Sequence, residues 1–169
     1  MLNIVFVEPE IPQNTGSTAR LCAATGAALH LVGKLGFRID DAAVKRAGLD
    51  YWEHVRLKLH PSLESLKKAA PEEARFFYFS SSADLLYTDV QYRAGDFLVF
   101  GKESTGLPRE ILEQNRASCF RIPILNTVRS LNLATAAGIV LYEALRQHDF
   151  IYLNKNNHRA TEGTEKDGV

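Results

Sequence analysis

Five short apolar runs, separated by helix-like stretches, constrain the fold of this chain more than any other feature. Each run is apolar on consecutive residues, a pattern typical of strands buried on both faces of a parallel sheet. The runs are NIVFV at 3–7, LHLVG at 29–33, RFFYFS at 75–80, DFLVF at 96–100 and CFRIPI at 119–124. Helices are expected between and after them at 15–25, about 40–48, 62–70, 108–116 and 130–147. The sequence therefore predicts an α/β fold with a mostly parallel sheet.

The chain of 169 residues suits one compact domain, which we place at residues 1–153. Its last predicted helix is the clearest, because apolar residues recur at helical spacing after Ser130, the expected N-cap. From residue 154 to 169 the sequence is polar, contains glycine and has no periodicity. We expect this segment to be a disordered tail.

The charges and the cysteines limit the possible partners and compartment. Twenty basic and twenty acidic residues cancel, so any nucleic acid must bind a local patch, such as one assembled across two subunits. Cys22 and Cys119 lie far apart without metal-ligand spacing, which argues against a disulfide framework and a zinc site. The sequence shows no basic leader and no run of membrane-spanning length. We expect a cytoplasmic protein with no membrane partner.

The familiar motifs of nucleotide, metal and covalent-serine chemistry are missing. No Gly-x-Gly-x-x-Gly follows the first apolar run, and GDFLVFGKES at 95–104 has the wrong glycine spacing for a phosphate-binding loop, with Glu103 in place of Ser or Thr. No His-Glu-x-x-His pair, Gly-x-Ser-x-Gly elbow or metal-spaced carboxylate cluster occurs. We therefore expect no metal.

Three polar clusters, 14–20, 101–108 and 122–132, follow apolar runs, at the sheet edge where ligands bind in open α/β folds. Each also has a purely structural interpretation. Asn14 can cap a helix, and the second cluster can be an ordinary strand–turn–helix connection with a turn at Gly106 and a helix opened by Pro108.

Together, the three clusters resemble the motifs of the SpoU-type 2′-O-ribose RNA methyltransferases of the SPOUT superfamily. The first motif matches NTGSTAR at 14–20, the second FGKESTGLP at 100–108, and the third Ile122-Pro123 with SLNL at 130–133. The resemblance extends over residues 2–146. The short length, the opening LNIVFVEPEIPQNTG and KRAGLDYW at 45–52 resemble a minimal subfamily that methylates the wobble nucleotide of certain leucine tRNAs.

The resemblance implies a parallel sheet with helices on both faces, a C-terminal trefoil knot and a homodimer. It also implies S-adenosylmethionine as the cofactor, held mainly by backbone groups of the knot and released as S-adenosylhomocysteine. Carried over to this sequence, the cofactor-binding residues are Phe79, Gly101, Ile122, Ser130 and Leu131. Hydropathy patterning alone gives no reason to expect a knot, because knots are rare.

The catalytic residues that the resemblance implies are Arg20, Asn14, Glu103 and Asn132. A guanidinium stays protonated in proteins, so we expect Arg20 to hold the phosphate beside the target ribose rather than to act as a base. Glu103 is expected to orient the Arg20 guanidinium. Structural alternatives remain open: Arg20 as an exposed helix residue, Asn14 as a cap and Glu103 in a loop salt bridge.

The expected substrate is the anticodon stem-loop of tRNA, methylated at a cytidine or modified uridine at position 34, with no role for DNA. The expected substrate-binding residues are Gly16, Arg20, Arg46, Tyr51 and Arg129; further candidate RNA contacts are Arg38, Lys45, Trp52 and His54. Tyr51 and Trp52 can equally be core or dimer residues. Other functions left open are methylation of another tRNA position or of ribosomal RNA, a non-catalytic RNA-binding protein and a dinucleotide-dependent oxidoreductase.

Overall fold

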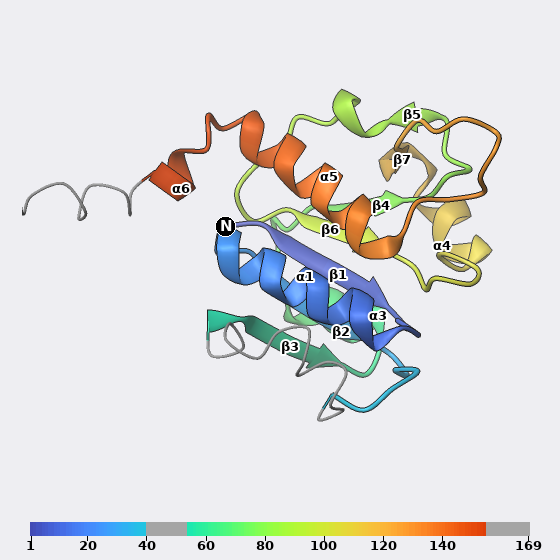
Figure 1. Cartoon of the computed structure of the whole chain (residues 1–169), viewed down its shortest axis with the longest axis horizontal. Coiled ribbons are helices and arrows are strands. Elements are labelled where there is room, and N and C mark those ends of the chain that lie inside the picture. Colours follow the sequence, from blue (N-terminus) through green and yellow to red (C-terminus); the bar gives the residue numbers. More distant parts are fainter. Residues whose placement is uncertain (40–53, 155–169) are drawn as a thin grey trace, which may run out of the picture.

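The computed structural model describes residues 1–39 and 54–154 (Figure 1). Their seven strands form one sheet in the order β3-β2-β1-β6-β4-β7-β5, and every neighbouring pair is parallel. The strands are β1 Asn3–Val7, β2 Ala28–Val32, β3 Arg56–His60, β4 Phe76–Phe79, β5 Leu85–Leu86, β6 Phe97–Phe100 and β7 Cys119–Arg121. The predicted parallel α/β sheet is confirmed.

Helices cover both faces of the sheet. On one face lie α1 (Pro12–Thr25) and α5 (Leu133–Arg146), side by side in Figure 1, whose apolar residues join those of the central strands in one core cluster. On the other face lie α3 (Leu63–Ala69) and α4 (Arg109–Gln114), which pack against a second cluster. The short elements are the 3-10 helices η2 Tyr87–Asp89 and η3 Arg116–Ser118 and the final helix α6 Ile151–Asn154.

The strand predictions missed two strands and overextended one. β3, of sequence RLKLH, alternates between polar and apolar residues because it lies at the sheet edge with much of its surface exposed. β5 has only two residues and lies at the opposite edge. β7 ends at Arg121, before Pro123, which has no N–H to continue the ladder. The predicted helix at 40–48 lies outside the described residues.

Two helix starts differ from the predictions. α1 begins at Pro12, three residues early, because proline suits the first helical position and lacks only an N–H that would have had no partner there. α5 begins at Leu133, and its N-cap is Asn132, whose side chain accepts a hydrogen bond from Thr135 N. The prediction that Ser130 caps this helix is therefore wrong.

The knot and the disordered tail remain predictions. The strand order is consistent with a threaded C-terminal part, since β6 is inserted between β1 and β4 before β7 is added beyond β4. The first residue of the predicted tail, Asn154, is the last residue of α6, and residues 155–169 lie outside the described part. None of the described helices is long and apolar enough to cross a membrane.

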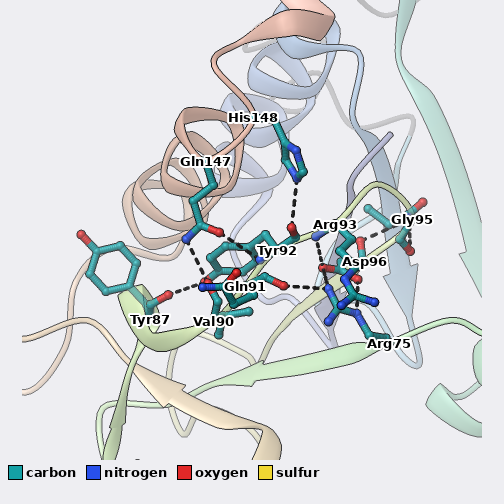
Figure 2. Close-up of polar contacts among 11 residues, drawn as sticks. Arg75, Tyr87, Val90, Gln91, Tyr92, Arg93, Gly95, Asp96, Gln147 and His148 are labelled. Carbon is teal, nitrogen blue, oxygen red and sulfur yellow. Dashed lines mark hydrogen bonds and ion pairs between the residues drawn. The ribbon is translucent and has the colours of Figure 1, made fainter.

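At the edge where the strands begin, a partly buried ion pair joins the starts of two neighbouring strands (Figure 2). Arg75 donates to both carboxylate oxygens of Asp96, at 2.8 and 2.6 Å, and Arg93 N donates to the same carboxylate at 2.6 Å. The Asp96 side chain is only 3% exposed. The start of β4 is thus fastened to the start of β6.

The same edge holds the C-terminal end of α5 (Figure 2). Gln147 donates to Val90 O at 2.9 Å and accepts from Tyr92 N at 3.0 Å, while His148 Nε2 donates to Tyr92 O at 3.0 Å. We call this set the amino-edge clamp: Arg75, Val90, Tyr92, Arg93, Asp96, Gln147 and His148. It fixes one end of the helix whose other end lies at the candidate site.

Candidate active site

At the opposite edge, where the strands end, three loops surround a cavity of about 500 Å³. The loops follow β4, β6 and β7, as the sequence predicts for ligand-binding loops of a parallel sheet. All five predicted cofactor residues line this cavity: Phe79, Gly101, Ile122, Ser130 and Leu131. Asn14, Glu103, Asn132 and Arg129 line it as well. Residues separated by more than a hundred positions therefore meet at one site.

Three of the predicted catalytic side chains form one hydrogen-bonded chain. Asn132 Nδ2 donates to Asn14 Oδ1 at 2.8 Å, and Asn14 Nδ2 donates to Glu103 Oε1 at 2.8 Å. The direction of the chain is fixed because Asn132 Oδ1 accepts from Thr135 N as the helix cap, which turns its amide nitrogen toward Asn14. The capping of α5 thereby orients the site.

The Glu103 carboxylate also joins two loops. Its Oε2 accepts from Glu10 N at 2.7 Å, and its Oε1 accepts from Ile11 N at 3.2 Å. These are backbone groups at the start of α1, whose N-cap Ile11 has no side-chain acceptor of its own. Among the described residues no bond joins Glu103 to Arg20, so the expected pairing of these two side chains does not form within the chain.

Gly101 occupies a close crossing of two backbones. A Cβ at this position would lie 2.0 Å from the Gly106 carbonyl carbon and 2.1 Å from Leu107 N. The loop returns on itself here through a turn in which Gly106 N donates to Lys102 O at 2.9 Å and Gly106 has φ of 72°. No residue other than glycine fits at 101 without displacing the backbone.

Two acidic side chains of the loop after β1 contact residues that line the cavity. Lys102 Nζ lies 3.2 Å from Glu8 Oε2, and Glu10 Oε2 accepts from Ser104 N at 3.1 Å. The Ser104 hydrogen bond, and to a smaller extent the Lys102 charge, lower the pKa of Glu10. Glu8 has φ of 51°, an uncommon conformation for a residue other than glycine.

Arg20 and Gly16 lie on α1 but do not line the cavity. Arg20 follows Asn14 by six residues, which corresponds to about 9 Å along a helix and about 240° around it. Arg20 is exposed, whereas Gly16 is buried. Asn14 and Arg20 therefore point to different sides of α1.

The other predicted substrate residues divide into two groups. Arg129 is exposed in the loop before α5 and lines the cavity. Arg46 and Tyr51, together with Lys45 and Trp52, lie in the segment 40–53, outside the described residues. His54 is exposed just before β3.

Several residues of the cavity were missed by the sequence reasoning. Ser80 and Ser81 follow β4 directly, and Ile11 and Lys102 contribute from the loops after β1 and β6. The three consecutive serines after a buried apolar run were the available signal; Ser80 N donates to Phe120 O and fixes that loop beside β7. A second cavity of about 560 Å³, between α3 and α4, holds none of the predicted residues.

The cavity has the size and the lining of a small-molecule site. In residues 1–39 and 54–154 no three His, Cys, Asp or Glu side chains gather in a way that could hold a metal ion. Burial raises the pKa of Cys22 to about 12, which keeps this thiol protonated. The volume of the cavity lies in the range typical of small-molecule sites, and its lining combines apolar side chains with hydroxyl and amide groups.

The chain is similar in sequence to known RNA methyltransferases. The SpoU rRNA Methylase family matches residues 1–142. A tRNA (cytidine(34)-2′-O)-methyltransferase of Burkholderia cenocepacia is 44% identical over 152 residues, covering 89% of this chain and 97% of that protein.

Solved structures agree with this match. One that concerns the 2-OH methylation of C/U34 on tRNA has a TM-score of 0.85 and 47% identity, covering 89% of this chain and 97% of the other. The SpoU methyltransferase AviRb of Streptomyces viridochromogenes, in complex with the cofactor AdoMet, has a TM-score of 0.78 and 25% identity, covering 89% of this chain and 61% of its own. The chain belongs to the SpoU methylase family.

Proposed function

We propose that the protein transfers a methyl group from S-adenosylmethionine to the ribose 2′-hydroxyl of nucleotide 34, a cytidine or modified uridine, in leucine tRNAs. The observation that carries the proposal is the convergence of all five candidate cofactor residues on the one cavity that the Asn132–Asn14–Glu103 chain borders. The relatives named for methylation of position 34 support the choice of nucleotide.

The cavity fits the cofactor in both size and chemistry. Phe79, Ile122 and Leu131 offer apolar surface for an adenine ring, and the Ser130 hydroxyl and loop backbone offer hydrogen bonds. Gly101 allows the loops to come close enough to enclose a ligand. When bound, S-adenosylmethionine supplies an already activated methyl group and leaves as S-adenosylhomocysteine.

The task of the protein is then to place the 2′-oxygen and to assist loss of its proton. Correct placement of two reactants can supply about 7–11 kcal/mol of rate enhancement in favourable cases. The Asn14 and Asn132 amides are held in fixed directions at the cavity, as positioning of a ribose requires. Arg20 is proposed to bind the adjacent phosphate and to favour the ionised hydroxyl by its positive charge.

The position of Arg20 supports a homodimer as the active form. Arg20 lies on a different side of α1 from Asn14 and does not line the cavity of its own chain. We infer that Arg20 of a second copy reaches the mouth of the cavity, so that one tRNA contacts both subunits.

A mixing experiment tests this assignment. Arg20→Ala, which keeps the cofactor cavity, is mixed with Ser130→Trp, which places a bulky side chain at the lining of the cavity and leaves the Gly101 crossing intact, after each is shown to be folded and inactive alone. Equal mixing of a dimer that exchanges subunits should restore about a quarter of wild-type activity, because half the dimers are mixed and each has one complete site. No recovery, with mixed dimers demonstrated, would show that Arg20 acts within its own chain.

The function itself is tested with labelled S-adenosylmethionine and total tRNA, followed by mapping of the methylated nucleotide. We expect the label at position 34 of leucine tRNAs, as a ribose resistant to alkaline cleavage. Label at another tRNA position or in ribosomal RNA would replace the substrate assignment. Cofactor binding without incorporation into any RNA would indicate a non-catalytic RNA-binding protein.

A further inference from the structure

One carboxylate lines the cavity, and two more contact Lys102 and Ser104, which also line it, where the loops after β1 and β6 meet. We call Glu8, Glu10 and Glu103 the acidic rim. Glu103 lines the cavity itself, while Glu8 and Glu10 belong to the loop that Glu103 holds through Glu10 N and Ile11 N. A polyanionic substrate that approaches this side meets three negative charges, which oppose its binding.

Lys102 is the cation placed among these carboxylates. Its ammonium lies 3.2 Å from Glu8 Oε2, and its charge also acts on Glu10. The Lys102 side chain is 32% exposed and lines the cavity, so it can reach a ligand without rearrangement of the backbone. In the described part of the chain, Arg129 is the other cation that lines the cavity.

The backbone of Glu8, the partner of Lys102, is fixed by its conformation and by a hydrogen bond. Glu8 has the left-handed φ of 51°, and its backbone N donates to Val32 O at 2.8 Å. Gly33 allows the Glu8 side chain to lie where it does, because a Cβ at Gly33 would come within 3.0 Å of Glu8 Cγ. Lys102, in contrast, has a long flexible stem and a charge that can turn between acceptors.

We propose that Lys102 is a substrate-positioning residue that exchanges its ion pair with Glu8 for a backbone phosphate of the bound RNA. This inference rests on the proposed function, because it requires a tRNA at the cavity mouth. The Glu8 pair is half-exposed, and pairs of this kind contribute little, so a phosphate can replace the Glu8 carboxylate at small cost. The exchange lets RNA approach the acidic rim.

Salt dependence of tRNA binding separates this role from a merely structural one. Each phosphate neutralised by the protein contributes roughly 0.7–0.9 to the slope of log Kd against log salt concentration. Lys102→Met should weaken tRNA binding about fivefold to tenfold at low salt and lower that slope by about 0.7–0.9. Lys102→Arg should restore both the affinity and the slope.

Two further variants complete the test. Glu8→Gln, with Lys102 intact, should tighten tRNA binding about twofold to fivefold, because the RNA phosphate no longer competes with the Glu8 carboxylate for Lys102. The salt dependence of binding should not change. Lys68→Met removes the same charge at an exposed position of α3 and should leave the salt dependence of tRNA binding unchanged. All variants are measured in the full-length protein, and thermal unfolding checks that each variant is folded.

The outcomes separate failure of the Lys102 assignment from failure of the proposed function. If wild-type protein methylates tRNA but Lys102→Met keeps the wild-type slope, or the Lys68→Met slope falls equally, the Lys102 assignment is overturned while the proposed function stands. If the wild-type protein neither binds nor methylates tRNA, the proposed function itself fails. A slope lowered only in Lys102→Met and restored in Lys102→Arg supports the exchange.

Discussion

The two edges of the sheet hold the two ends of α5 in different ways. At the amino edge, Gln147 and His148 bond to backbone groups, and Asp96 is almost fully buried. At the carboxyl edge, the bonds of Asn132 and Asn14 join side chain to side chain beside an open cavity. We infer that the first edge serves stability, whereas the second edge uses part of its polar network for ligand binding.

The largest effect should come from the close crossing at the carboxyl edge. Gly101→Ala places a Cβ 2.0 Å from a backbone carbon, so either the loop moves or the fold is lost. We expect a loss of at least about 3 kcal/mol in the free energy of unfolding, and no detectable cofactor binding. Urea unfolding and calorimetric titration with S-adenosylmethionine measure the two quantities.

A glycine of the amino edge supplies the control. Gly95, unlike Gly101, has a positive φ, of 96°, and a Cβ there meets no atom of the described residues within 4 Å. Gly95→Ala should cost only about 1–2 kcal/mol from backbone strain and leave cofactor affinity unchanged. Equal losses in the two variants would contradict the distinction between the edges.

The amino-edge ion pair should contribute to stability without affecting chemistry. Asp96→Ala leaves Arg75 beside the sheet without its buried carboxylate, which should cost about 3 kcal/mol. The exposed pair Arg116–Asp84 is the matched control, and Asp84→Ala should cost less than about 0.5 kcal/mol. Methylation per folded molecule should stay at the wild-type rate in both variants, and a loss in Asp96→Ala would show that the edges are coupled.

A histidine joined to the amino edge predicts a pH dependence. Asn3 bonds both to Gly95 O and Asp96 O and to His30 Nε2, and His30 Nδ1 lies 3.0 Å from His60 Nε2. Burial, and then the charges of His60 and Lys58, lower the pKa of His30 to about 4, and burial and Lys58 also lower the pKa of His60.

As the pH falls, His30 is protonated in the unfolded chain at a higher pH than in the folded protein. The contribution of His30 to stability is therefore complete above about pH 6.5 and is lost as the pH falls toward 4. The loss for His30 between pH 7 and pH 5 should be about 2 kcal/mol. His30→Gln should remove this part of the dependence in urea unfolding. A wild-type curve that is parallel to the variant's between these pH values would refute the assignment.

The capping residue of α5 allows the two roles of the carboxyl edge to be separated. Asn132→Ala removes the cap and the bond to Asn14, which should cost about 1 kcal/mol and reduce methylation more than tenfold. Asn132→Ser keeps a capping oxygen but has no amide to donate to Asn14. The free energy of unfolding should therefore return to the wild-type value in Asn132→Ser, while methylation stays low. Recovery of both quantities would show that Asn132 acts only as the N-cap of α5.

The smallest effect is expected in the middle of α5, between the two edges. A Cβ at Gly138 would touch only Leu21 Cδ2, at 3.8 Å, so the added methyl fits between α5 and α1. Gly138→Ala should raise stability by about 0.5–1 kcal/mol, because glycine is costly inside a helix. Thermal unfolding measures this gain, and a lower melting temperature would show that the spacing of the two helices is tighter than the contact implies.

The sequence by itself determined the parallel sheet, because strands buried on both faces are apolar on consecutive residues whatever their neighbours. It also located the candidate site, because polar residues that directly follow such strands must gather at one edge. β3 escaped prediction since its RLKLH pattern reflects exposure at the sheet edge, which depends on strand order. Strand order is set by long-range pairing, so the sequence did not show which strand would lie at the edge.

Only the tertiary structure decided how the site residues are partnered. Ser130 and Asn132 are both good caps, and the choice of Asn132 depends on where α5 meets Asn14 of a distant helix. Glu103 was expected to orient Arg20, but it holds the start of α1 instead, because that backbone presents two N–H groups beside it. Hydrogen-bond partners are set by distances of a few ångströms between segments far apart in sequence, and composition and spacing do not encode such distances.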